Sequence, residues 1–530
     1  MSGKTGNGSI VDLESLKALV APQNNKIVVD RVAKEGSVRL LPGAKRKRGS
    51  SLRQVCASLM ANIGTINTGM AFGFPAVAIP QLQEENNGFI TIDKYQSSWI
   101  ASLSAVGTPI GCLLSGYLMD LIGRKRALII TQFPMLAGWL LIGSATSLPM
   151  IYAGRLLVGL GSGMVGAPAR VYTGEATQPH LRGMLAAIGS VGVSLGVLIE
   201  YALGACLLPW KTIAIVSSVV PALALIGALL IPETPSFLMS SGKVESSKKA
   251  LSKLRGPTCD IDFEAGELQR FAEKNNIHKP TVKETLKGLM QRSTYVPFFI
   301  LALYFLIYQF SGVNPITFYA VNIFQESGAK MDKHLATVLT GVVRLIFTVV
   351  SAGLLRRCGR RPLTFVSSIG CGLTLLVLGT YMYFNSQWIE QGVEPKYTWI
   401  PVTALLLFTI ASVMGYLVVP WVMISEVYPT QIRGVAGGLT TFSAHFCIFL
   451  VVKTYPILQD FASNYGAFWF YGAVSMLGTV FFYVYLPETK GRTLQEIEEY
   501  FTGQRDTLKA PKKSKNIPPV IAAPKGNALP

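Results

Sequence analysis

Long apolar runs, separated by short polar segments, fill most of the chain after residue 55. Runs of about 18 to 25 mainly apolar residues are long enough to cross the hydrocarbon core of a bilayer as helices. Twelve such runs are present, at 56–80, 98–119, 127–147, 150–171, 184–206, 211–231, 295–323, 335–355, 363–384, 399–424, 435–456 and 466–486. The pattern therefore predicts an all-α membrane protein with twelve transmembrane helices.

A polar stretch divides these helices into two sets of six. Within it, Leu251 with Leu254 and Leu268 with Phe271 recur at helical spacing among Lys and Glu, which is typical of short amphipathic helices. The predicted organisation is a cytoplasmic, disordered tail (1–55), an N-terminal six-helix half (56–232), cytoplasmic linker helices (233–293), a C-terminal six-helix half (294–487) and a second cytoplasmic tail (488–530).

Charge then gives the orientation. The chain has a formal net charge of +19, although only 15% of its residues are charged and 50% are hydrophobic. With both termini cytoplasmic, about 40 of the 48 Lys and Arg fall in inner segments, as the positive-inside rule requires. The basic excess can therefore meet anionic inner-leaflet lipids, and no nucleic-acid partner is needed to explain it. We expect a multi-pass protein of the plasma membrane that functions as a monomer.

Cysteine usage adds no further chemistry. The seven Cys are scattered, mostly within apolar runs, and show neither metal-ligand spacing nor a disulfide framework. No metal site and no cofactor are expected.

The two halves carry the same charged phrase. Glu175 to Gly183 recurs as Glu426 to Gly434, with Glu and Arg seven residues apart in both copies. Gly123-Arg124-Lys125 pairs in the same way with Gly359-Arg360-Arg361, and Pro232-Glu233-Thr234 with Pro487-Glu488-Thr489. Two similar membrane halves with matching surface charges are typical of an alternating-access transporter.

A set of motifs resembles that of the sugar porter family, in the major facilitator superfamily. In chain order these are Gly123 to Arg126, Gly154-Arg155, Glu175 to Gly183, Pro232 to Pro235, Gln309 to Asn314, Pro420-Trp421, Glu426 to Gly434 and Pro487 to Gly491. Ser98-Trp99-Ile100 and Val452-Lys453-Thr454 are similar to the insect facilitated trehalose transporter-like branch. The resemblance covers about residues 50 to 500 and implies the major facilitator fold and a transporter, not an enzyme.

The resemblance implies that the repeated charges form salt bridges of a cytoplasmic gate. These pairs would join helices when the cavity is closed to the cytoplasm and hydrate when it opens. Ordinary interfacial ion pairs, worth about 0 to 1 kcal/mol each, are the alternative. The gate residues are Arg124, Glu175, Arg182, Glu233, Arg360, Glu426, Arg433 and Glu488. Arg356 stands where family members usually carry an acid, so one gate carboxylate is missing from the second half.

A sugar site is expected near the middle of the bundle, because amides bond sugar hydroxyls and aromatic rings stack on their C–H faces. In 295–323, Gly312 and Pro315 soften the helix around the amides. The expected substrate contacts are Gln309, Asn314, Tyr308, Phe318, Tyr319, Ser190, Arg344, Trp421 and His445. The resemblance also shows that Ser190, Tyr308, Arg344, Ala444 and His445 replace the usual family residues, which indicates an altered specificity.

Arg344 lies near the middle of a predicted span, where a charge is costly unless it meets water or a partner. Two interpretations stay open, a contact with substrate in the cavity or a structural ion pair with a carboxylate such as Glu200.

Residues 52–80 contain no Asp or Glu, whereas proton-driven members of the family carry an acid there that pairs with the arginine matching Arg155. A facilitative carrier of a hexose or trehalose is therefore favoured. The alternatives are a proton-coupled symporter that uses Glu200 or His445, and a non-transporting nutrient receptor with the same fold.

Overall fold

The computed structural model describes residues 49–84, 90–185, 187–256, 259–276, 282–429, 432–492 and 494–504, and within these ranges the chain forms helices and no strands. The predicted tails therefore lie largely outside the described residues. The amino-terminal half comprises α2 (Ser51–Gln83), α3 (Lys94–Ile122), α4 (Arg124–Gly143), α5 (Leu148–Ala176), α6 (Pro179–Leu185), α7 (Ile188–Ala205), α8 (Trp210–Ser217) and α9 (Val219–Leu230).

Four short helices connect the halves, as the amphipathic pattern predicts: α10 (Pro235–Ser240), α11 (Val244–Arg255), α12 (Ile261–Asn276) and α13 (Val282–Leu289). Met239, Leu251 and Ala265 form a small apolar core among the first three. The Arg255 guanidinium joins this group to α5, since it pairs with Glu264 at 2.7 Å and donates to the Ala176 carbonyl at 2.6 Å.

The carboxyl-terminal half comprises α14 (Arg292–Phe310), α15 (Val313–Phe318), α16 (Ala320–Glu326), α17 (Lys333–Arg357), α18 (Arg360–Glu390), α19 (Ile400–Met414), α20 (Val419–Val427), α21 (Arg433–Tyr485) and α22 (Leu494–Thr502). The seventh predicted span is therefore interrupted, because it consists of α14, α15 and α16. Similarly, α19 and α20 together make up the tenth span.

The prediction of twelve transmembrane helices is confirmed. Among the described residues, ten helical segments are long and apolar enough to cross a membrane. One of them is α21, which is broken at Ser463 (φ +63°, ψ 166°) and so contains the eleventh and twelfth spans. The remaining span is α2, whose buried face carries Asn62, Thr65 and Asn67 and is correspondingly less apolar.

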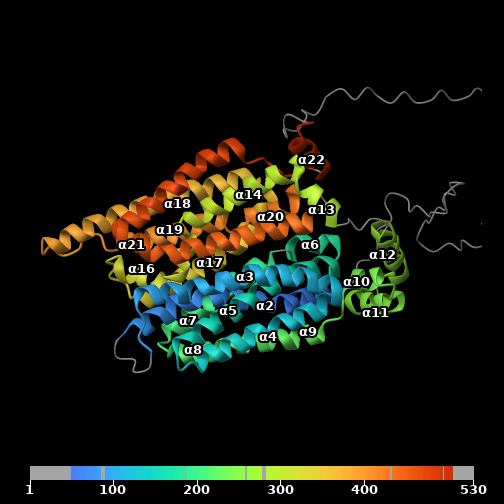
Figure 1. Ribbon diagram of the computed structural model, residues 1–530, viewed down its shortest axis with the longest axis horizontal. Helices are drawn as coiled ribbons and strands as arrows, with labels where there is room; N and C mark the ends of the chain where they lie inside the picture. The colour runs from blue at the N-terminus through green and yellow to red at the C-terminus, as the bar shows by residue number, and fades with distance from the viewer. Residues whose placement is uncertain are drawn as a thin grey trace, which may run out of the picture.

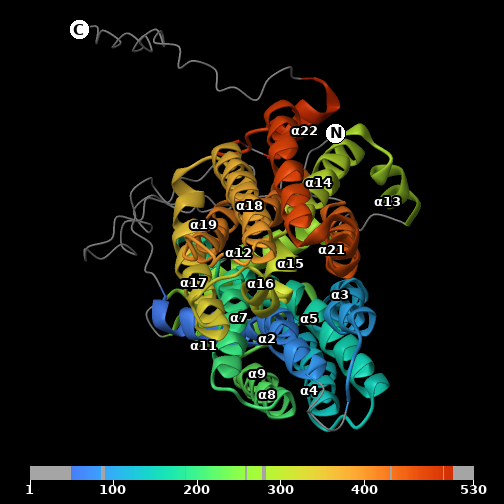
Figure 2. The same ribbon diagram turned by 90° about the vertical axis from the view of Figure 1, so that its left-hand side faces the viewer.

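The halves lie side by side along the length of the bundle (Figure 1). We call the end that holds the Gly123-Arg124 and Gly359-Arg360 turns and α10 to α13 the basic end. Figure 2 looks onto the other end, here called the opposite end, where α3 lies beside α21 and α2 lies beneath α16.

Helices within a half approach closely at small residues. A Cβ on Gly107 of α3 would lie 2.5 Å from the Leu156 carbonyl oxygen of α5, and one on Gly138 of α4 would lie 2.7 Å from that of Gly154. Because apolar side chains gain nothing by leaving lipid for one another, such close backbone packing holds membrane helices together.

Candidate functional site

The repeated charges at the basic end form a cluster within the amino-terminal half. The Arg124 guanidinium pairs with Glu175 at 3.0 Å, and the other oxygen of Glu175 accepts from Thr234 Oγ1 at 2.6 Å. Glu233 accepts from the backbone N–H groups of Arg124 and Lys125 at 3.0 and 3.1 Å, at the start of α4. A carboxylate at a helix amino terminus satisfies free N–H groups and the helix dipole together.

The carboxyl-terminal half repeats this cluster. Arg360 pairs with Glu426, which also accepts from Thr489 Oγ1 at 2.7 Å. Glu488 accepts from the backbone N–H groups of Arg360 and Arg361 at 3.0 and 3.1 Å, at the start of α18. The sequence repeat is therefore a repeat of three-dimensional geometry.

Each cluster joins helices of one half, not helices of different halves. The remaining predicted gate residues, Arg182 and Arg433, add no contact between the halves among the described residues. Arg182 is exposed and donates to the Thr177 carbonyl at 3.4 Å, and the Arg433 side chain lies outside the described residues. Asp120 adds a 3.5 Å contact to Arg124, whereas the equivalent position in the second half is Arg356, as the sequence indicated. A role for the eight residues as a gate stays a prediction.

At the opposite end, cationic groups do connect the halves. Lys453 of α21 places its ammonium 4.1 Å from the Tyr95 ring centroid and 3.9 Å from that of Trp99, both on α3. It also donates to Ser98 Oγ at 2.8 Å. We call Lys453, Tyr95, Trp99 and Ser98 the ammonium clamp. Cation–π contacts of this kind contribute about 0.5 to 2 kcal/mol each, depending on exposure.

A second charge contact lies beside the clamp. Lys94 at the start of α3 pairs with Asp460 of α21, and both side chains are largely exposed. Further from α3, Asn322 donates to Gln83 at 3.4 Å. The opposite end of the bundle is therefore closed between the halves.

Toward the basic end, a cleft lies between α2 and α7 of one half and α17 of the other. The hydrogen bond between Ser194 and Thr348, 2.8 Å long, joins α7 to α17. On its basic-end side lies this cleft, of about 450 Å³, lined by side chains of α2, α7 and α17 that include Asn62, Ile66, Leu195 and Val349. None of the predicted sugar contacts lines this cleft, although Ser190 is adjacent in sequence to its wall at Val191.

The predicted amides lie where the seventh span is interrupted. Gly312, at φ +82°, separates α14 from α15, a conformation that side chains other than glycine rarely adopt. Across this break Asn314 Nδ2 donates to Gln309 Oε1, and both residues are buried. Gln309 Nε2 has no hydrogen-bond partner although it is buried. An unpaired amide donor in a membrane interior is costly unless a ligand completes it.

Aromatic rings extend from this break toward the basic end. Trp421 of α20 lies 5.0 Å from Phe305 and 5.7 Å from His445 between ring centroids. Phe305 in turn lies 6.4 Å from Tyr308. His445 donates from Nδ1 to the Thr441 carbonyl at 2.9 Å, so this nitrogen is engaged within its own helix.

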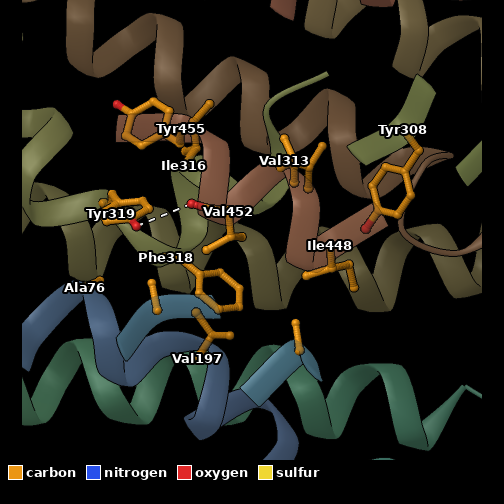
Figure 3. Packing of buried hydrophobic residues seen from close by; sticks show 14 of the residues in the cluster. Ala76, Val197, Tyr308, Val313, Ile316, Phe318, Tyr319, Ile448, Val452 and Tyr455 are labelled. Atoms are coloured by element: carbon orange, nitrogen blue, oxygen red, sulfur yellow. Dashed lines mark hydrogen bonds between the residues drawn. The ribbon is translucent and has the colours of Figure 1, made fainter. Parts of the chain in front are cut away.

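Phe318 and Tyr319 lie on the other side of the break (Figure 3). Phe318 projects toward Val197 of the amino-terminal half and lies 5.4 Å from the Phe72 ring. The Tyr319 hydroxyl donates to the Val452 carbonyl at 3.4 Å. Phe318 therefore packs between the halves, and Tyr319 packs within the carboxyl-terminal half next to the ammonium clamp.

Arg344 does not pair with Glu200. Its Nη1 donates to Thr317 Oγ1 of α15 at 3.0 Å, and its Nε has no partner. Glu200 accepts from Ser217 Oγ at 2.6 Å, and its other oxygen is unpartnered. The alternative of a structural pair between these two residues is therefore wrong, whereas a substrate contact by Arg344 stays a prediction.

Arg155 is fully buried and is held by backbone oxygens. It donates to the carbonyls of Ile100 and Ala71 at 2.8 Å each and to Ser104 Oγ at 2.9 Å. The arginine thus ties α5 to α2 and α3 without an acid in α2, in agreement with the absence of Asp and Glu from 52–80.

Two groups of residues escaped the sequence analysis. Tyr201 of α7 donates to the Thr317 carbonyl at 2.7 Å, so Thr317 receives groups from both halves. Lys453 was noticed only as part of a branch motif. The sequence does contain features that indicate this contact. Lys453 is an ammonium within an apolar run, and Tyr95 and Trp99 are aromatic residues one helical turn apart, which could bind a cation.

Comparison with known proteins agrees with this architecture. The family model described as sugar (and other) transporter matches residues 57–501. The facilitated trehalose transporter Tret1 of Apis mellifera ligustica is 32% identical over 495 residues, which span 93% of this chain and 96% of that protein. The Bombyx mori Tret1 is 31% identical over 466 residues, spanning 88% and 90%.

Solved structures share the fold. The partially occluded inward open conformation of the xylose transporter XylE from E. coli superposes with a TM-score of 0.68 at 21% identity, covering 84% of this chain and all of that one. The proton:xylose symporter XylE bound to 6-bromo-6-deoxy-D-glucose gives 0.67 at 23% identity, covering 85% and 99%.

Proposed function

Because the chain belongs to the sugar (and other) transporter family, we propose that it carries a hexose or trehalose down its gradient by alternating access. The observation that carries this proposal is the interrupted seventh span, which buries the unpaired Gln309 amide near the middle of the bundle. Broken helices at the midplane are the usual place for a transporter's substrate, because they free polar groups where a ligand can complete them. The relatives named as facilitated trehalose transporters favour trehalose as one substrate to test.

In the proposed cycle, the structure corresponds to a state in which the opposite end is closed and the cleft has begun to open at the basic end. Gln309 and Asn314 bond substrate hydroxyls, and Trp421 offers a ring to a sugar face. Breaking the ammonium clamp would then let α3 and α21 separate and expose the same site to the other side. Ser194 and Thr348 lie between the site and the cleft, so they separate the substrate from the basic end.

The charge distribution supports placing the basic end in the cytoplasm, with both termini there and the protein in the plasma membrane. Anionic inner-leaflet lipids then face the basic loops. One chain contains both halves of the site, so a monomer suffices as the functional unit.

Purified protein in liposomes tests the proposal. Labelled glucose and trehalose should equilibrate without accumulating, and a protonophore should leave the rate unchanged. Gln309→Ala should slow flux at least 10-fold, because it removes a donor that only substrate completes. Absence of flux for both sugars in wild-type protein that still binds one of them would favour the receptor alternative.

A proton-coupled symporter is the second candidate, and Glu200 is the observation that favours it. This carboxyl is fully buried, has one unpartnered oxygen and interacts electrostatically with Arg155. Accumulation several-fold above the external sugar, abolished both by a protonophore and by Glu200→Gln, would replace the facilitative reading with this one.

A further inference from the structure

The buried polar groups around the interrupted seventh span are rich in donors. Arg344 is 6% exposed and leaves Nε without a partner, and Gln309 is fully buried and leaves Nε2 without a partner. Their bonded partners are Thr317 and Asn314, which lie three residues apart on one face of α15. The two free donors therefore border the same short helix.

No carboxylate of the described residues is placed to neutralise Arg344. The groups that interact with it electrostatically are the hydroxyls of Tyr201 and Tyr308, from α7 and α14. The buried carboxylate closest in sequence to these contacts, Glu200, accepts a hydrogen bond from Ser217 and makes no ion pair with Arg344. Burying a guanidinium in this way is costly, and hydroxyl dipoles offset that cost only in part.

We propose that the physiological substrate class is a sugar acid, a monosaccharide that carries one carboxylate, held by the free Nε edge of Arg344. This inference rests on the transport function proposed above and specifies its substrate. The Nε edge of a guanidinium matches a carboxylate with two parallel hydrogen bonds, an arrangement stronger and more selective than bonds to hydroxyls. Thr317 anchors the opposite nitrogen, so the edge is held in one orientation. Gln309 Nε2 then donates to a ring hydroxyl.

A sugar acid and its neutral parent separate this proposal from general sugar transport. Glucuronate and glucose differ only at C6. In proteoliposomes, the wild type should move labelled glucuronate with a kcat/KM at least 10-fold above that for glucose. Because the uniported substrate is an anion, a diffusion potential of 100 mV set with potassium and valinomycin should change its steady-state ratio by about 50-fold and leave that of glucose unaffected.

Variants of Arg344 test the residue itself. Arg344→Asn should lower glucuronate flux at least 10-fold, while glucose flux is kept or rises. Arg344→Lys keeps the charge but loses the paired bonds, so its glucuronate flux should lie between those of wild type and Arg344→Asn. The matched control is Arg126→Asn, which removes an exposed arginine near the start of α4, at the basic end. It should change both fluxes equally if it changes them at all.

Three results would overturn the proposal. One is a wild type that carries glucose or trehalose but not glucuronate, which leaves the transport function intact. Another is glucuronate flux that Arg344→Asn and Arg344→Lys, with unchanged thermal midpoints, do not reduce. The third is a wild type that moves none of these sugars, which refutes the transport function as well.

Discussion

The two ends of the bundle use charge in opposite ways. At the basic end, Arg124 and Arg360 are bound to carboxylates of their own half. At the opposite end, Lys453 of the carboxyl-terminal half meets rings of α3, and Lys94 of α3 meets Asp460 of α21, so both contacts cross the halves. The contacts at the opposite end must break before the halves can separate there, whereas the clusters at the basic end can stay intact when the halves separate.

Charged contacts can therefore do two different things, stabilise one half or set the balance between states, and the sequence pattern alone does not tell them apart. A contact within a half need not break when the halves separate, so it contributes to the stability of that half. A contact across the halves exists in one state only, so it contributes to the balance between states. In this structure the clusters at the basic end therefore hold together helices of one half, and we refer to them as braces.

The largest effect is expected from breaking a brace. Arg124→Ala or Arg360→Ala strands a carboxylate that is only about a fifth exposed, 21% for Glu175 and 23% for Glu426. The cost should be about 2 kcal/mol, below the ~3 to 5 kcal/mol of fully buried pairs because water reaches these groups. The thermal midpoint of the purified protein measures it, with Arg126→Ala, an exposed neighbour, as the control.

The gate interpretation makes a different prediction for the same cluster. Glu426→Ala or Arg433→Ala should then increase labelling of a cysteine at Gly353, which lines the cleft and where a Cβ meets no neighbour. If these variants keep the wild-type thermal midpoint and label faster at this cysteine, the charges belong to the gate. Both ends of the bundle would then use charge to set the balance between states.

A smaller effect, in the balance between states, is expected from the ammonium clamp. Lys453→Met loses two ring contacts and one hydrogen bond that exist only while the opposite end is closed. The closed state should lose about 1 to 2 kcal/mol, which changes the ratio of states about 5- to 30-fold. Labelling at Gly353→Cys should slow accordingly. Lys453→Arg, which keeps the cation over the rings, should label at nearly the wild-type rate, and equal rates in all three proteins would exclude a gating role.

The smallest effect is expected from Lys94→Met. This ammonium has the same charge as Lys453 and lies at the same end of the bundle, but its ion pair with Asp460 is largely exposed. Exposed pairs contribute about 0 to 1 kcal/mol, so the ratio of states should change less than about 5-fold. Raising the salt concentration should remove this difference and leave that of Lys453→Met. A larger change than for Lys453→Met would show that charge, and not ring contact, closes this end.

Local properties of the sequence were sufficient for the helices and the repeated clusters. A run of apolar residues forms a helix in a bilayer because no other conformation satisfies its backbone there. The motifs that hold Arg124, Glu175 and Glu233 recur in the same order around Arg360, Glu426 and Glu488, so the repeat predicted matching clusters. Gly312 and Pro315 likewise indicated where the seventh span weakens, although not that it breaks at Gly312 and again at Tyr319.

By itself, the sequence determined the all-α membrane fold, the two halves and the arginine near the middle of α17, because hydropathy and charge act within a single segment. Only the tertiary structure decided which groups meet. It placed Arg344 on Thr317 and not on Glu200, and Lys453 between the rings of Tyr95 and Trp99. The physical reason is that such partners come from different helices. Arg344 meets Thr317 because α15 and α17 pack together within one half, and Lys453 meets its rings because the two halves pack together.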